Sequence, residues 1–158
     1  MKKTLFAVVA VFALLIVFAS AHSTKPSDGT VGSMAPNIEI ANEHSSFSLP
    51  QMRGKYVLLT FWSSDDAQSR IDNQQYEQAA VDHNIAFVGM NFDPSKGVFH
   101  EIVKIDRLEN KSQYHVSGDV AEHIVDSYHL QSHYVTYLIS PEGEVISRNP
   151  SLEELARI

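Results

Sequence analysis

The 158-residue chain contains no cysteine. This absence excludes disulfide bonds, a thiolate nucleophile and thiol–disulfide exchange, because each of them requires a cysteine sulfur. An excess of positive charge is also absent, since 12 lysines and arginines stand against 19 aspartates and glutamates and the net charge is −7. Nucleic acid as a partner therefore has no electrostatic support. The sequence has no glycine-rich phosphate loop and no nucleotide-binding fingerprint, and it predicts no cofactor.

The N-terminal segment is the most apolar part of the chain. Two lysines precede the uncharged run Leu5–Ala19, and the small residues Ala19-Ser20-Ala21 follow it. This order is typical of a secretory signal peptide, which we place at residues 1–21. An uncleaved anchor is the alternative, because Thr4–Ala21 has 18 residues, just enough to span a bilayer. We expect an exported protein, periplasmic or envelope-associated, that meets the membrane only if this segment is retained.

The rest of the chain is predicted to form one domain. Residues 22–32 are rich in Ser, Thr, Pro, Asp and Gly, which indicates a flexible linker before a domain at residues 33–158. Apolar runs and alternation predict the strands Ile38–Ile40, Phe47–Leu49, Tyr56–Trp62, Ile85–Phe92, Gln113–Val116, Val135–Ile139 and Val145–Ser147. Helical spacing predicts the helices Asp65–His83, Val98–Leu108, Val120–Tyr128 and one that begins after Ser151. Strands separated by helices indicate a layered α/β domain.

The spacing of apolar residues also predicts which helical positions face the core. These are Ala67, Ile71, Ala79 and Ala80 in the first helix, Val98, Ile102, Ile105 and Leu108 in the second, and Val120, Ile124 and Tyr128 in the third. Tyr128 and Tyr137 are both expected in the core.

Three segments resemble the thioredoxin-like superfamily, in particular the AhpC/TSA-related proteins of the TlpA/ResA type. APNIEI at residues 35–40 is similar to APDFTL, and MRGKYVLLTFW at residues 52–62 is similar to LRGKVVLLNFW. YHLQSHYVTYLISPEGEVISRN at residues 128–149 aligns without a gap to YGVQGIPTTFLIDPEGKIIARN. The resemblance implies a thioredoxin-like fold, with a central mixed β-sheet flanked by helices and an N-terminal β extension.

The resemblance also locates the family's redox site, whose pattern is roughly GKxVLLNFWAxWCxxCR. Residues 54–70 read GKYVLLTFWSSDDAQSR, which puts Asp66 at the first cysteine and Ser69 at the second. The family activity would be thiol–disulfide exchange, and this chain cannot perform it through a CxxC motif. We expect Asp66, or one of its neighbours Ser64 and Asp65, to serve as the N-cap of the following helix. The alternative is a carboxylate used for acid–base chemistry or metal ligation.

A second hallmark of the family, a cis-proline beside the redox pair, is also replaced. The ungapped alignment puts Tyr134 at that position, after His133. A cis bond before a residue other than proline costs about 3–4 kcal/mol. We therefore expect a trans bond here and a substrate loop of different shape.

Histidines add candidate metal ligands near this loop. His129 and His133 are four residues apart, and the fold that the resemblance implies brings His133 near Asp65 and Asp66. A zinc or copper site is conceivable on this basis. Surface histidines scattered over an acidic protein are the alternative, and the sequence has no HxH or HExxH pattern.

The sequence thus predicts an exported thioredoxin-fold protein without redox function, acting as a binding or accessory module for an envelope protein or peptide. The residues expected around its contact surface are Trp62, Ser63, Ser64, Asp65, Asp66, His133, Tyr134 and Val135. Trp62 is also expected to pack beneath the turn. The alternative is an enzyme or metal-binding protein that uses Asp65, Asp66 and His133.

Overall fold

A computed structural model of the chain describes residues 25–41, 46–131 and 133–158. The predicted signal peptide at residues 1–21 lies outside these ranges. Within them, no helix is both long enough and apolar enough to cross a membrane.

The strands are β1 (Glu39–Ala41), β2 (Ser46–Ser48), β3 (Val57–Trp62), β4 (Ala86–Asn91), β5 (Gln113–His115), β6 (Thr136–Ile139) and β7 (Val145–Arg148). The helices are η1 (Leu49–Met52), α2 (Ala67–Asp82), α3 (Lys96–Ile105), α4 (Gly118–Ser127) and α5 (Leu152–Leu155).

The centre of the fold is a five-stranded mixed sheet in the order β5-β4-β3-β6-β7. Strand β3 runs parallel to β4 and antiparallel to β6, and all six of its residues are buried. The run VLLTFW has no polar face because helices or hairpins cover both sides of the strand. The predicted α/β fold, with a central mixed sheet and an N-terminal β extension, is confirmed.

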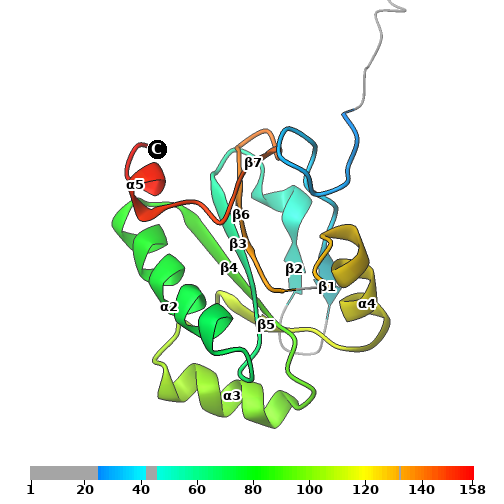
Figure 1. Ribbon diagram of the computed structural model, residues 1–158, viewed down its shortest axis with the longest axis vertical. Helices are drawn as coiled ribbons and strands as arrows, with labels where there is room; N and C mark the ends of the chain where they lie inside the picture. Colours follow the sequence, from blue (N-terminus) through cyan, green and yellow to red (C-terminus); the bar gives the residue numbers. More distant parts are fainter. Residues whose placement is uncertain (1–24, 42–45, 132) are drawn as a thin grey trace, which may run out of the picture.

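The sheet separates two layers of packing (Figure 1). On one face, α2 and α5 cover Leu58 and Leu138 together with Ala79, Ala80 and Leu155. On the other face lie α4 and the β1–β2 hairpin, which bury a larger core. Tyr128 and Tyr137 belong to that core with 0% and 1% exposure, so their predicted burial is confirmed.

The described part of the predicted linker, residues 25–32, packs against the domain. Gly32 N donates to Val145 O at 2.8 Å, and Lys25 Nζ lies 2.5 Å from Glu144 Oε1. Gly29 is buried beside Tyr128. Backbone hydrogen bonds and an ion pair thus hold these residues against the domain, where the sequence predicts a flexible linker. Residues 22–24 lie outside the described ranges.

Three helices expose residues that were predicted to face the core. In α2, Ala67 and Ile71 are exposed, and the polar residues Ser69 and Asn73 are buried in their place. The reason is that this face of α2 meets polar groups of the sheet.

In α3, the positions that face the core are shifted by about one residue from those predicted. Val98 and Ile105 are 46% and 64% exposed, whereas Phe99 and Val103 are buried. Phe99 lies against Trp62, with 6.3 Å between the ring centroids, and this aromatic contact fixes which face of α3 turns inward. In α4, Val120 is likewise 44% exposed, while Ile124 is buried as predicted.

Candidate functional site

The turn between β3 and α2 carries the two positions that hold cysteines in the related sequences. Asp66 is the N-cap of α2, with extended backbone angles of φ −102° and ψ 99°. Its Oδ1 accepts a hydrogen bond from Ser69 N at 2.9 Å. The predicted capping role of Asp66 is therefore confirmed. The carboxylate occupies the end of the helix at which free N–H groups and the helix dipole favour an anion.

Ser69 is buried one turn into the helix, with 5% of its surface exposed. Its Oγ accepts from Ser63 N at 3.2 Å and donates to Asp66 O at 3.1 Å. The hydroxyl thus ties the start of α2 to the end of β3. A serine in these contacts links the backbone of the turn and presents no free nucleophile to solvent.

Beneath this turn lies a carboxylate that the sequence analysis did not identify. Asp93 lies two residues after the end of β4 and is only 2% exposed. Its Oδ1 lies 2.7 Å from both Ser63 Oγ and Ser64 N, which donate to it. His115 Nε2 donates to the carbonyl of Asp93 at 2.8 Å. Its position just after a predicted strand could have identified it. The carboxyl ends of the parallel strands β3 and β4 meet at one edge of the sheet, so residues that follow these strands lie close together.

The Ser63 hydroxyl stands between two carboxyl groups. Besides Asp93 Oδ1, it is within hydrogen-bonding reach of Asp65 Oδ1. A serine hydroxyl carries a single proton, so it donates to one of these carboxylates at a time. The turn therefore places a buried carboxylate and an exposed one on the same hydroxyl.

A buried polar cluster supports the end of β3 from the side of α2. Trp62 Nε1 donates to Gln113 Oε1 at 3.0 Å, and Gln113 Nε2 donates to Glu77 Oε1 at 3.1 Å. Asn73 lies against the same Gln113 oxygen, at the weaker distance of 3.5 Å. A Cβ on Gly89 would lie 2.1 Å from Gln113 Oε1, so glycine is needed there for the amide to approach the sheet.

Tyr134 covers the turn from the loop before β6. The described residues contain no cis peptide bond, so the expected trans bond between His133 and Tyr134 is confirmed. The ring stacks on Phe92, with 5.5 Å between centroids. Burial raises the pKa of the Tyr134 phenol, the nearby carboxylates of Asp65, Asp66 and Asp93 raise it further, and a hydrogen bond with Ser63 opposes them. An aromatic ring therefore stands beside these acids at the position of the family proline.

The predicted contact surface is only partly exposed. Asp65 and His133 are exposed, and Ser64, Asp66 and Tyr134 are half-buried. Trp62, Ser63 and Val135 are 0%, 1% and 3% exposed, so they do not face solvent at this surface, and the predicted packing of Trp62 beneath the turn is confirmed. These three residues stand at the ends of central strands that are covered on both faces, so they shape the surface from below.

The candidate metal ligands are not assembled into a site. His129 and His133 are both exposed. Among the residues that the structure describes, no group of three or more His, Asp or Glu side chains is placed to hold a metal ion. Asp65, Asp66 and His133 are therefore not brought together as metal ligands.

Comparison with known proteins agrees with this fold. Residues 31–148 match the AhpC/TSA family. No curated protein matches the chain. Among solved structures, a thioredoxin-like protein from Parabacteroides distasonis is 32% identical, with a TM-score of 0.69 and an alignment that covers 82% of this chain and 93% of that one.

Two further structures belong to proteins named for thiol–disulfide chemistry. The thioredoxin domain of a thiol-disulfide oxidoreductase from Bacteroides vulgatus is 23% identical, with a TM-score of 0.69 and coverage of 81% and 94%. A thiol:disulfide interchange protein from Bacteroides sp. is also 23% identical, with a TM-score of 0.67 and coverage of 81% and 86%. At this identity they support the fold alone. This chain therefore belongs to the AhpC/TSA family and has a thioredoxin-like fold, and it is a member without a single cysteine.

Proposed function

We propose that this protein is an exported, non-catalytic binding module of the cell envelope. It contacts a protein or peptide through the surface formed by Ser64, Asp65, Asp66, His133 and Tyr134, called here the former redox surface. The main support for the proposal is the role of the two residues that occupy the family's cysteine positions. Asp66 and Ser69 bond to each other and to the turn, while Asp65 and His133 stay exposed. The scaffold thus presents a surface without the chemistry of its relatives.

The composition of this surface supports a contact with protein. Tyr134 offers a half-buried ring stacked on Phe92, and aromatic side chains are enriched at protein interfaces. Asp65 places a carboxylate beside that ring and favours a partner with a positively charged group. Export is supported by the signal-peptide pattern of residues 1–21, and N-terminal sequencing of the mature protein should give His22 as its first residue.

Site-specific photo-crosslinking in the native cells tests the contact. A photoreactive benzoylphenylalanine replaces Gln68, which is exposed in the first turn of α2. We expect one discrete adduct, and we expect it to disappear when Asp65→Lys is added. The same label at Glu142, exposed in the turn before β7, should give no such adduct.

The matched charge control is Glu142→Lys, which should leave the Gln68 adduct unchanged. Equal adducts at both label positions, or an adduct that survives Asp65→Lys, would contradict a contact at the former redox surface. Circular dichroism of each variant confirms that the fold is retained.

A further inference from the structure

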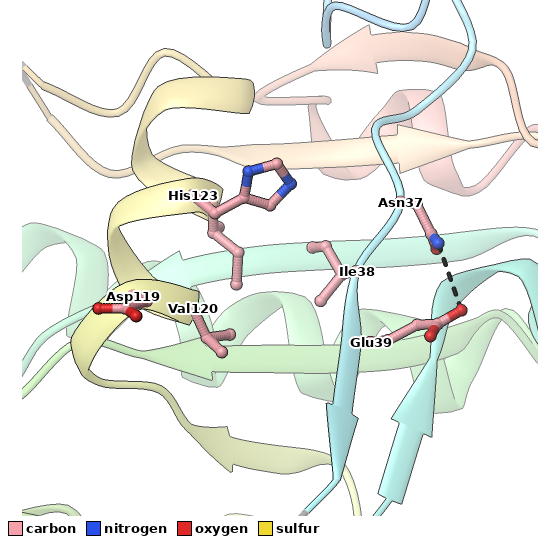
Figure 2. Close-up of a pocket in the computed structure, with 7 residues that line it drawn as sticks. Asn37, Ile38, Glu39, Asp119, Val120 and His123 are labelled. Atoms are coloured by element: carbon pink, nitrogen blue, oxygen red, sulfur yellow. Dashed lines mark hydrogen bonds between the residues drawn. The ribbon is translucent and has the colours of Figure 1, made fainter.

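A concave surface lies between α4 and the chain that enters β1 (Figure 2). It has a volume of about 370 Å³ and is lined by Asn37, Ile38, Glu39, Asp119, Val120, His123 and Ile124. We call it the α4 groove. No residue of the former redox surface lines it.

The floor of the α4 groove is apolar. Ile38 and Ile124 are 2% and 1% exposed and form its base, and Val120 adds a side chain that is 44% exposed. In Figure 2 the side chains of Ile38 and Val120 both extend into the space between α4 and β1. An aliphatic group bound here would remove Val120 from water and add to the driving force for binding.

The rim of the α4 groove is acidic. Glu39 and Asp119 contribute carboxylates, and no lysine or arginine is among the lining residues. Asn37 Nδ2 donates to Glu39 Oε1 at 3.3 Å, which restricts the position of that carboxylate (Figure 2). The charge of the groove therefore complements a cationic side chain.

The backbone of β1 supplies a third feature. Alternate residues of an antiparallel pair direct their N–H and C=O groups toward the partner strand. Leu49 N donates to Ile38 O at 3.0 Å, so Ile38 and Ile40 are the residues whose backbone N–H and C=O groups point toward β2. Glu39 then directs its N–H and C=O groups away from β2, to the side on which α4 lies (Figure 2). Within the described residues, β1 pairs with no other strand.

We propose that the α4 groove binds an extended peptide segment of a protein partner, in which lysine or arginine alternates with aliphatic residues. The peptide pairs with the outer edge of β1 at Glu39, as an added strand. Its aliphatic side chains lie on Ile38, Val120 and Ile124. Its cationic side chains reach the carboxylates of Glu39 and Asp119. The site is independent of the former redox surface.

Fluorescence anisotropy with synthetic peptides tests this proposal on the exported protein. The probe is a labelled nine-residue peptide of alternating lysine and valine. In the first control peptide, glutamate replaces each lysine. In the second, alternate backbone nitrogens are methylated, which removes the hydrogen bonds of an added strand. We expect the probe to bind at least tenfold more tightly than either control. We also expect its affinity to fall with added salt, because the carboxylates at the rim are screened.

Substitutions in the protein locate the binding. Glu39→Gln combined with Asp119→Asn should weaken the probe at least fivefold. The matched control, Glu101→Gln with Glu142→Gln, also removes two exposed carboxylates and should leave the affinity unchanged. Equal binding of the glutamate peptide, or equal loss in both double variants, overturns the proposal. Full affinity of the methylated peptide overturns the added strand and leaves only the capture of cationic side chains.

Discussion

The two ends of β3 differ in what holds them together. At its amino end, near residue 57, the neighbouring turns are tied by backbone groups: Gly54 N donates to Pro141 O and Gly143 N donates to Ser140 O, at 2.9 and 2.8 Å. At its carboxyl end, the turn is tied by side chains, with Asp66, Ser69 and Asp93 accepting bonds from backbone N–H groups. In Figure 1 the described chain enters near the first end, while α2 begins at the other.

This difference explains where the family sequence persists and where it is lost. The motifs at the amino end, Gly54-Lys55 and Pro141-Glu142-Gly143, remain because their glycines have φ of +87° and +84°, a conformation that other residues rarely adopt. At the carboxyl end, the turn requires only side chains that accept hydrogen bonds from its backbone. A carboxylate and a hydroxyl group both meet this requirement. A redox pair can therefore be lost there without loss of the scaffold.

The largest effect is expected at the carboxyl end, from Asp93→Ala. This change leaves Ser64 N without its buried acceptor and leaves Ser63 Oγ with Asp65 alone, and it should lower the free energy of unfolding by about 2 kcal/mol. Urea unfolding followed by circular dichroism measures it. Asp93→Asn keeps an acceptor oxygen and should recover at least half of the loss. Equal losses in both variants would mean that these hydrogen bonds do not stabilise the turn.

The amino end should respond to Gly143→Ala through backbone strain. Gly143 has φ of +84°, and an added Cβ would also displace the Arg53 guanidinium, whose Nη1 would be 1.3 Å away. Arg53 is exposed and can move, so the strain dominates, and we expect a loss of about 1–2 kcal/mol. Thermal unfolding gives the value. Arg53→Ala in the same background should not restore stability, and full restoration would show that the side-chain clash dominates.

The cap of α2 is expected to contribute less. Asp66→Ala removes the acceptor for Ser69 N and should cost about 1 kcal/mol, whereas Asp66→Asn retains the cap and should stay close to the native protein. Chemical unfolding of both variants under one condition makes the comparison. A loss in the asparagine variant as large as that in the alanine variant would point to a role for the charge in place of the cap.

The smallest effect is expected for the pH-dependent ion pair that links α2 to the end of α3. Arg70 donates to both oxygens of Asp106, at 2.6 and 2.5 Å, and this contact lowers the pKa of Asp106. The pair therefore stabilises the fold fully above the pKa of an unfolded aspartate, about 3.9, and the gain is lost as pH falls through the folded value. Asp106→Asn should cost less than about 1 kcal/mol at pH 6. At pH 3 this difference should shrink, and a constant difference would contradict the pairing.

The sequence predicted the order of the strands and helices because each buried strand is a long apolar run and each turn has its own signal. It also predicted the cap at Asp66, since N-capping depends on local geometry. Burial on α2 was mispredicted at Ile71, because Asn73 faces a polar cluster assembled from distant strands. The role of Asp93 depends on contacts with Ser63 and Ser64, about thirty positions away, and periodicity carries no information about such pairs.

The most direct test of the central claim is the reduction of insulin by the purified protein with dithiothreitol as electron donor. A thioredoxin with an intact CxxC motif serves as the positive control in the same assay. We expect a rate equal to that of dithiothreitol alone, because the positions of the redox pair hold Asp66 and Ser69 and the chain has no thiol. Turnover above that background, proportional to protein concentration, would contradict it.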